Sequence, residues 1–293
     1  LGSLVNFEGV TKTGVGTLNI NGPAATDLQQ VNVLGGTLNI GPGATVSAQD
    51  TTVGNGATLN VDGSFTGTSG NDTMTVAGRL TGTGTVDLLD GDDTFTIQDG
   101  ADLSGLANAV DGGAGTDTFL ADIAGSATLG GAINFETLSK TNIGTLHVDG
   151  PASSSFTTVN VRGGTLDIGA GGAISGAVTT TVASGATLNV DGGYTGSAGN
   201  DSFDVSGTVS GSGAIDLAAG DDTLTLNDGA VLNNVIDGGA NGAGDTVVLN
   251  NAAAMTFDSS HTINFEFLTK NNVGAATLVG TSTFSGGTTL NAG

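Results

Sequence analysis

The chain repeats itself, and this internal repetition limits the folds open to it more than any other feature. The tripeptide Asn-Phe-Glu begins at Asn6, Asn134 and Asn264, and the heptapeptide that starts at Ala57 returns unchanged at Ala186. The Asn-Phe-Glu copies lie 128 and 130 residues apart, so small insertions have been accommodated at turns. Such a chain stacks similar units instead of folding different elements around one core. We expect one continuous solenoid with a first unit at 1–133, a second at 134–263 and the start of a third at 264–293.

A shorter repeat of 20 to 22 residues lies within each unit. The tetrapeptide Thr-Leu-Asn-Ile and its variants begin at Thr17, Thr37, Thr58, Thr145, Thr165 and Thr187. Aliphatic and polar residues alternate in it, which is typical of a short strand with one buried face. Clusters of Gly, Asn and Asp separate the strands and leave no room for crossover helices. The sequence therefore predicts an all-β fold, a parallel β-helix (solenoid), with aliphatic ladders inside and Thr, Asn and Asp outside. We expect it to be right-handed from the general rule for parallel crossovers.

Composition excludes several classes of protein. There are 53 glycines among 293 residues without a three-residue period, which excludes collagen, and 37% hydrophobic residues argue against a disordered chain. The net charge of −23 reflects 28 acidic residues against 5 Lys and Arg, which disfavours nucleic acid and anionic lipid as partners. No apolar run is long enough to insert into a membrane. The chain starts without Met or a signal peptide, and we expect it to be part of a longer protein.

Two segments resemble a known family. Residues 12–22, Lys-Thr-Gly-Val-Gly-Thr-Leu-Asn-Ile-Asn-Gly, are similar to the first half of the passenger-associated repeat of bacterial autotransporters, and residues 284–293 are similar to its second half. The sequence departs from that pattern after Gly22 and at Asn272, where the motif has glycine. The resemblance implies a β-helical passenger that is exported to the bacterial cell surface, where it is attached to the outer membrane. Such passengers are commonly adhesins.

The resemblance leads to two expectations for function. The first is a segment of a secreted surface adhesin that gives adhesion or an extended stalk, with an unknown host, abiotic or glycan ligand. The alternative is a purely structural surface filament that self-associates, because uncapped coils expose backbone hydrogen-bonding groups at their ends. A binding site should be visible as an aromatic or charged departure present in only one of the two units, and Tyr194 is one such departure.

A second motif, Gly-x-Asp-Thr-apolar or a close variant of it, recurs about once per coil. Its aspartates are Asp72, Asp93, Asp117, Asp201, Asp222 and Asp245. Their spacing predicts that they stack at one corner of the solenoid. Residues 112–120, Gly-Gly-Ala-Gly-Thr-Asp-Thr-Phe-Leu, resemble the nonapeptide of the calcium-binding β-roll. The resemblance implies that these aspartates are ligands of calcium.

Two interpretations of the acidic turns stay open. In one, glycine turns the corner and aspartate bonds its own loop backbone, so the turns are purely structural. In the other, the aspartates are metal sites for calcium. Two carboxylates about 4.8 Å apart repel by roughly 1 kcal/mol in water and by about 3.5 kcal/mol at an effective dielectric constant of 20. A half-buried ladder therefore favours an ion more than an exposed one.

An enzyme is not expected, and a polysaccharide lyase or hydrolase is the less favoured alternative. The adjacent pairs Asp92/Asp93 and Asp221/Asp222 point to opposite faces of a strand, which suits no acid and nucleophile couple. Trp is absent and cations are few, so a site for an anionic glycan lacks its usual groups. We expect no catalytic residues, because His147 lies on the polar face of its strand and no nucleophile motif surrounds His261.

Three further features are expected to be structural. Glu and Lys recur four residues apart at Glu8/Lys12, Glu136/Lys140 and Glu266/Lys270. The three Phe residues of the Asn-Phe-Glu copies, Phe7, Phe135 and Phe265, are predicted to plug the core. One helical turn is suggested by the spacing of Leu103, Leu106 and Val110.

Overall fold

The structure is a computed structural model that describes residues 7–22, 25–149, 153–281 and 284–293. Nearly all of its regular structure is short β-strands that pair in parallel as a β-solenoid of about 13 turns, which confirms the predicted fold. The chain divides into two compact units, unit 1 (Leu1–Ser155) and unit 2 (Phe156–Gly293). This division falls about one coil after the boundary between the sequence repeats at 133/134.

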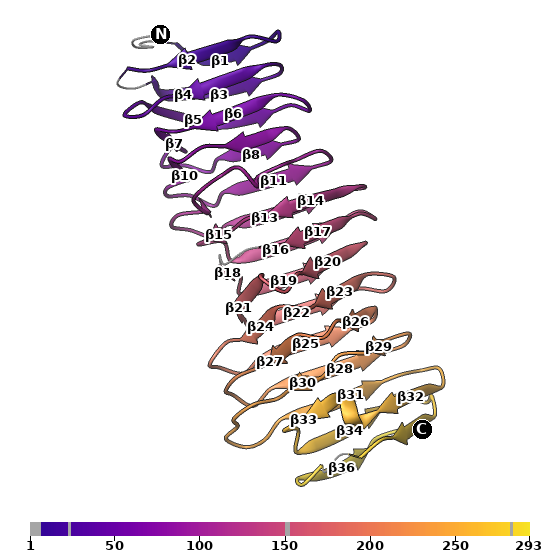
Figure 1. Ribbon diagram of the computed structural model, residues 1–293. Coiled ribbons are helices and arrows are strands. Elements are labelled where there is room, and N and C mark those ends of the chain that lie inside the picture. The colour runs from indigo at the N-terminus through magenta and orange to yellow at the C-terminus, as the bar shows by residue number, and fades with distance from the viewer. Residues whose placement is uncertain (1–6, 23–24, 150–152, 282–283) are drawn as a thin grey trace. The chain divides into compact units, whose positions relative to one another are not determined.

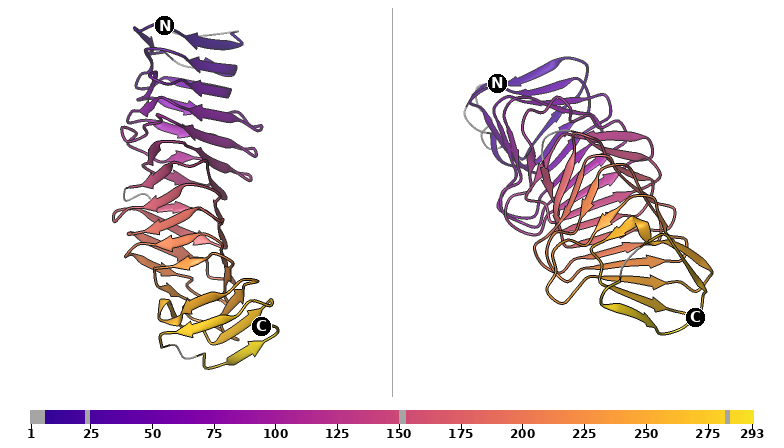
Figure 2. Two further views of the ribbon diagram at one scale, coloured as in Figure 1. Left: turned by 90° about the vertical axis from the view of Figure 1, so that its right-hand side faces the viewer. Right: turned by 60° about the horizontal axis from the view of Figure 1, so that its bottom comes forward.

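In unit 1 the coils lie one above another, and each adds strands to up to three strips of parallel sheet (Figures 1 and 2). The first strip contains β7 (Ser64–Thr66), β10 (Thr85–Asp87), β12 (Val110–Asp111) and β15 (Ala132–Ile133). The second contains β1 (Gly9–Lys12), β3 (Ala25–Val33), β5 (Thr45–Val53), β8 (Thr73–Val76), β11 (Thr94–Gln98), β13 (Thr118–Asp122) and β16 (Thr137–Thr141). The third contains β2 (Thr17–Ile20), β4 (Thr37–Ile40), β6 (Thr58–Val61), β9 (Arg79–Thr81), β14 (Ser126–Leu129) and β17 (Thr145–Val148), and β18 (Ser153–Ser155) is the last strand of the unit.

Unit 2 has the same three strips. The first contains β21 (Ala173–Ala177), β24 (Gly193–Gly196), β27 (Ala214–Asp216), β30 (Ile236–Asp237) and β33 (Thr262–Ile263). The second contains β19 (Thr158–Val161), β22 (Thr179–Val182), β25 (Ser202–Val205), β28 (Thr223–Asn227), β31 (Thr246–Asn250), β34 (Phe267–Asn271) and β36 (Gly287–Leu290). The third contains β20 (Thr165–Ile168), β23 (Thr187–Val190), β26 (Thr208–Ser210) and β29 (Val231–Leu232), followed by a separate pair, β32 (Met255–Asp258) and β35 (Ala276–Val279).

Stacking in register makes ladders of like residues, as predicted. In the third strip of unit 1, Leu38 lies between the equivalent leucines of β2 and β6 and is fully buried. On the outer side, the Asn39 amide donates to Asn19 Oδ1 at 2.9 Å and the Asn60 amide donates to Asn39 Oδ1 at 2.7 Å. Each coil is therefore joined to the next by a row of side-chain hydrogen bonds in addition to the backbone ladder.

Aromatic side chains fill part of the core of unit 1. Phe95 of β11 and Phe119 of β13 are in register with ring centroids 5.3 Å apart, and Phe119 meets Phe135 edge-on at 5.8 Å. Phe135 and Phe265 are buried, as predicted, but the prediction for Phe7 is wrong because its side chain is 57% exposed. Phe7 lies just before β1, the first strand of the unit, which pairs with β3.

The predicted helical turn at Leu103 to Val110 does not form. Val110 belongs to β12, and a tight turn joins the Leu106 amide to the Leu103 carbonyl at 3.0 Å. A single turn is too short to be stable as a helix, whereas Asp102 gains bridges to the coils on both sides. Among the described residues the only helix is the 3₁₀ turn η1 (Ser259–His261), and none is long and apolar enough to cross a membrane.

Candidate functional site

The six aspartates predicted as metal ligands occupy equivalent turns. In unit 1 each immediately precedes a strand of the second strip: Asp72 precedes β8, Asp93 precedes β11 and Asp117 precedes β13. In unit 2 the same places before β25, β28 and β31 hold Asp201, Asp222 and Asp245. Because these strands pair in register, the aspartates of each unit stack coil upon coil, which confirms the predicted stacking.

All six side chains are buried, with at most 4% of their surface exposed. The expectation that aspartates line the outside is therefore wrong for this motif. Each carboxylate accepts a hydrogen bond from a backbone N–H at this corner, either in its own loop or in the preceding coil.

In unit 1 the carboxylates form a continuous chain of hydrogen bonds. The backbone N–H of Asp72 donates to Asp93 Oδ1 at 2.8 Å, and the N–H of Asp93 donates to Asp117 Oδ1 at 2.7 Å. The N–H of Asp117 then donates to Glu136 Oε2 at 2.6 Å. We call this series the carboxylate ladder of unit 1, and it links four successive coils.

Unit 2 repeats the arrangement residue by residue. The N–H of Asp201 donates to Asp222 Oδ1 at 2.8 Å, and the N–H of Asp222 donates to Asp245 Oδ1 at 2.6 Å. The N–H of Asp245 donates to Glu266 Oε2 at 2.9 Å. These four residues are the carboxylate ladder of unit 2.

Both ladders also begin and end alike. The first carboxylate accepts from a hydroxyl residue of its own loop: Thr68 N–H and Oγ1 for Asp72, and Ser197 N–H and Oγ for Asp201. At the other end the glutamate of the Asn-Phe-Glu tripeptide replaces aspartate. Sequence reasoning missed the role of these glutamates, although their recurrence one coil after the last aspartate was the available signal.

Close approach between coils requires glycine in the later copies of the motif, whereas the first copies, Gly70 and Gly199, are not crowded. A Cβ on Gly91 would lie 2.6 Å from the carbonyl oxygen of Gly70, and a Cβ on Gly115 would lie 1.7 Å from that of Gly91. Both residues have positive φ, 139° and 152°. Only glycine lets the turns stack closely enough for the ladder bonds to form.

Each inner carboxylate keeps one oxygen that accepts no hydrogen bond. These buried atoms are Oδ2 of Asp93, Asp117, Asp222 and Asp245. Burial raises the pKa of Asp93 to about 6 and that of Asp222 to about 6, although the hydrogen bonds that these carboxylates accept from the N–H groups of Asp72 and Asp201 oppose the change. Burial also raises the pKa of the other four aspartates of the motif. At neutral pH the ladders therefore hold buried negative charge that is incompletely compensated.

The ladders offer calcium oxygen ligands, but carboxylates alone do not complete a site. Among the residues that the structure describes, no three or more His, Cys, Asp or Glu side chains gather in a way that could hold a metal ion. A calcium ion requires six to eight oxygens, so most of them would come from turn carbonyls. Calcium at the six aspartates stays a prediction.

The lysines that recur after Glu are structural, and their exact role was not predicted. Lys12, Lys140 and Lys270 occupy inward positions of the second strip and are at most 8% exposed. Lys12 Nζ donates to the carbonyls of Thr13, Gly14 and Gly35 at 2.7–2.8 Å. Lys140 and Lys270 likewise donate to the carbonyls of the next two residues. The residue two positions after each lysine has positive φ, and Asn272 adopts it (64°) as Gly14 does (72°), which explains why asparagine can replace glycine there.

The residues weighed as catalytic or surface-site candidates lie in different parts of the fold. Asp92 is exposed and its neighbour Asp93 is buried, so the two side chains point in opposite directions, as expected. His147 lies half-buried in β17, in register with Thr128. Tyr194 is 1% exposed, packs edge-on against Phe203 and bonds through its hydroxyl to that of Thr180. Tyr194 is therefore part of the core of unit 2 and does not mark a surface site.

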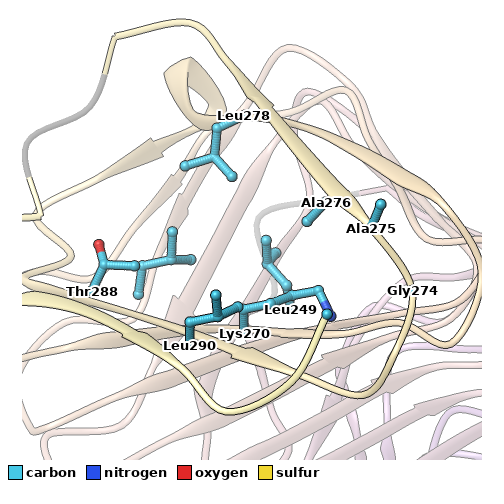
Figure 3. A pocket seen from close by; sticks show the side chains of 10 residues that line it. Leu249, Lys270, Gly274, Ala275, Ala276, Leu278, Thr288 and Leu290 are labelled. Atoms are coloured by element: carbon cyan, nitrogen blue, oxygen red, sulfur yellow. The ribbon is translucent and has the colours of Figure 1, made fainter.

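Unit 2 also contains an apolar pocket of about 320 Å³ in its last coils (Figure 3). Leu249, Leu268 and Leu290 of the second strip line it, and Leu278 of β35 lies across from them. This pocket is the continuation of the solenoid core, in line with the aliphatic ladders described above.

Comparison of the chain with models of protein families, with curated proteins and with solved structures finds no match.

Proposed function

We propose that the chain is a segment of a secreted bacterial surface adhesin, in which the two solenoid units serve as an extended stalk. Support comes from the likeness of residues 12–22 and 284–293 to passenger-associated repeats and from the parallel β-solenoid fold.

The observation that carries the proposal is that both units repeat the same carboxylate ladder. Each ladder joins four coils through three N–H to carboxylate bonds, in addition to the backbone ladders. In a solenoid each coil contacts only its neighbours, so the bonds between neighbours determine how well a long array resists unfolding. A repeated module that strengthens the bonds between neighbouring coils suits a protein that has to form a long stalk.

Calcium is the ion that we propose for the ladders. Asp93 and Asp117 in unit 1, and Asp222 and Asp245 in unit 2, would hold it through their unbonded oxygens. The ion would act structurally, by neutralising buried charge between adjacent coils.

Surface labelling of cells that produce the parent protein tests the proposal. Antibodies raised against the purified chain should bind intact cells, and brief external protease treatment should remove the signal. Labelling that requires permeabilised cells would refute a surface location.

Competition separates a stalk from an adhesive segment. Purified chain added in excess should leave attachment of the producing cells unchanged if the solenoid is only a stalk. Inhibition of attachment would show that these residues themselves contact the ligand.

A further inference from the structure

The third strip of unit 2 is interrupted at one place. Strand β29 pairs with β26, and β32 pairs only with β35, and no bridge joins β29 to β32 within the described part of the chain. Unit 1 is continuous at the equivalent coils, because Asp102 bridges Arg79 on one side and Thr128 on the other. An ion pair between Arg79 Nε and Asp102 Oδ2 at 3.0 Å joins the same coils of unit 1.

A local difference in sequence accompanies this interruption. Unit 1 has Ser-Ala-Thr-Leu-Gly-Gly at 126–131, where β14 buries Ala127 and Leu129. Unit 2 has Met-Thr-Phe-Asp-Ser-Ser-His at 255–261, where β32 buries only Phe257 and the 3₁₀ turn η1 follows. Asp258 fixes this turn by accepting from the N–H (3.0 Å) and the hydroxyl (2.7 Å) of Ser260. The segment is a charged and aromatic departure that only one unit contains.

The interruption leaves a cavity of about 380 Å³ among β29, β32 and β35. Its size is within the range of ligand sites in proteins. Apolar walls are supplied by Leu226, Val231, Leu232, Met255, Phe257 and Val279. Val231 and Val279 are each 43% exposed, so these walls are open to solvent.

Two polar groups give the cavity its chemical character. His261 lines it, and its Nδ1 atom is buried without a hydrogen-bond partner. Asp258 also lines it, and the Ser260 hydroxyl and N–H hold its pKa below the ordinary value, so its carboxylate is charged at neutral pH. A group that fits the Asp258 carboxylate would donate hydrogen bonds and carry positive charge.

We propose that this cavity of unit 2 binds the lysine or arginine side chain of a basic segment of a partner protein. The aliphatic stem of such a side chain packs against apolar walls while its charged end reaches polar groups at the rim. Asp258 pairs with the cationic end, and the ring of His261 lines the cavity beside it. The chain's net charge of −23 attracts basic partners over longer range.

The inference deepens the proposed adhesin function by naming the chemistry of a partner. Its test uses purified chain, so failure to bind would leave the cell-labelling result untouched. The chain contains only two histidines, His147 and His261, which makes histidine-selective NMR a direct assay. The His147→Asn variant assigns the two ring signals, because only the His261 signals remain.

The probe is Nα-acetyl-arginine methylamide, with the norleucine analogue as an uncharged control of similar stem length. We expect saturable shifts of the His261 ring signals with a midpoint in the millimolar range, and unmoved His147 signals. Asp258→Asn keeps the acceptor for Ser260 and removes the charge, and should weaken binding by roughly tenfold. Val231→Phe fills the cavity and should abolish the shifts.

Three results would overturn the proposal: unshifted His261 signals at the highest soluble probe concentration, equal shifts with the norleucine analogue, or unchanged affinity in Asp258→Asn. The first would show that the cavity binds no such side chain. The other two would show that any binding is purely apolar.

Discussion

The buried position of Asp93 predicts an unusual dependence of stability on pH. Its side chain is 1% exposed and its pKa is raised to about 6, mainly by burial. Because the folded chain binds this proton more tightly than the unfolded chain, the buried charge destabilises the fold fully above about pH 6. The destabilisation is relieved as pH falls from about 6 toward 3.8, the ordinary value.

The Asp93→Asn variant isolates this effect. A pKa difference of about two units corresponds to about 3 kcal/mol, and screening by solvent at the turn reduces it to about 1–2 kcal/mol. Asparagine keeps the oxygen that accepts from Asp72 N–H, and the cost of burying its amide is the same at every pH. We therefore expect the unfolding free energy of the variant, relative to the wild type, to fall by about 1 kcal/mol from pH 7.5 to pH 4.5, because part of the destabilisation persists until the pH approaches 3.8.

Urea unfolding followed by far-UV circular dichroism at the two pH values measures this difference. Asp92→Asn is the matched control, because its side chain is exposed and it undergoes the same change of charge one residue away. If the two variants show the same pH dependence, the assignment of buried charge to Asp93 is wrong.

Gly115→Ala should prevent folding or destabilise unit 1 severely, because the added Cβ would lie 1.7 Å from a carbonyl oxygen. Gly16→Ala is the control and should be nearly neutral, because a Cβ there would have no atom within 4 Å. Expression yields and melting temperatures of the two variants test this. Lys140→Met should cost about 1–3 kcal/mol in urea unfolding, because two turn carbonyls lose a charged donor. Phe119→Ala should cost about 3–5 kcal/mol in the same assay, and a loss below 1 kcal/mol would contradict its place in the aromatic stack.

The fold could be predicted from sequence because its signals are local and repeated. The alternation in Thr-Leu-Asn-Ile fixes which side chains point inward, and the 20- or 21-residue spacing aligns the leucines of successive coils. The turns could be predicted as well, because the glycine clusters that form them are also local and repeated.

The site was predicted only in part. The spacing of Asp72, Asp93 and Asp117 indicated stacking, but no period-two pattern extends into a turn, so their inward orientation was not visible. The glutamates take the turn position of an aspartate and the lysines take inward strand positions, and the partners of both are backbone groups that no residue pattern encodes. The cavity beside His261 depends on where β29 and β32 fail to pair, which is set by the packing of whole coils.

A thermal melt with calcium and with chelator, at pH 7.5 and at pH 5.0, tests most directly whether the ladders hold uncompensated buried charge. We expect calcium to raise the melting temperature at pH 7.5, because an ion bound only by the folded chain stabilises it. The rise should be much smaller at pH 5.0, where protons already neutralise Asp93 and Asp222. Superimposable melts with calcium and chelator at both pH values would contradict calcium at the ladders and leave them as hydrogen-bonded corners alone.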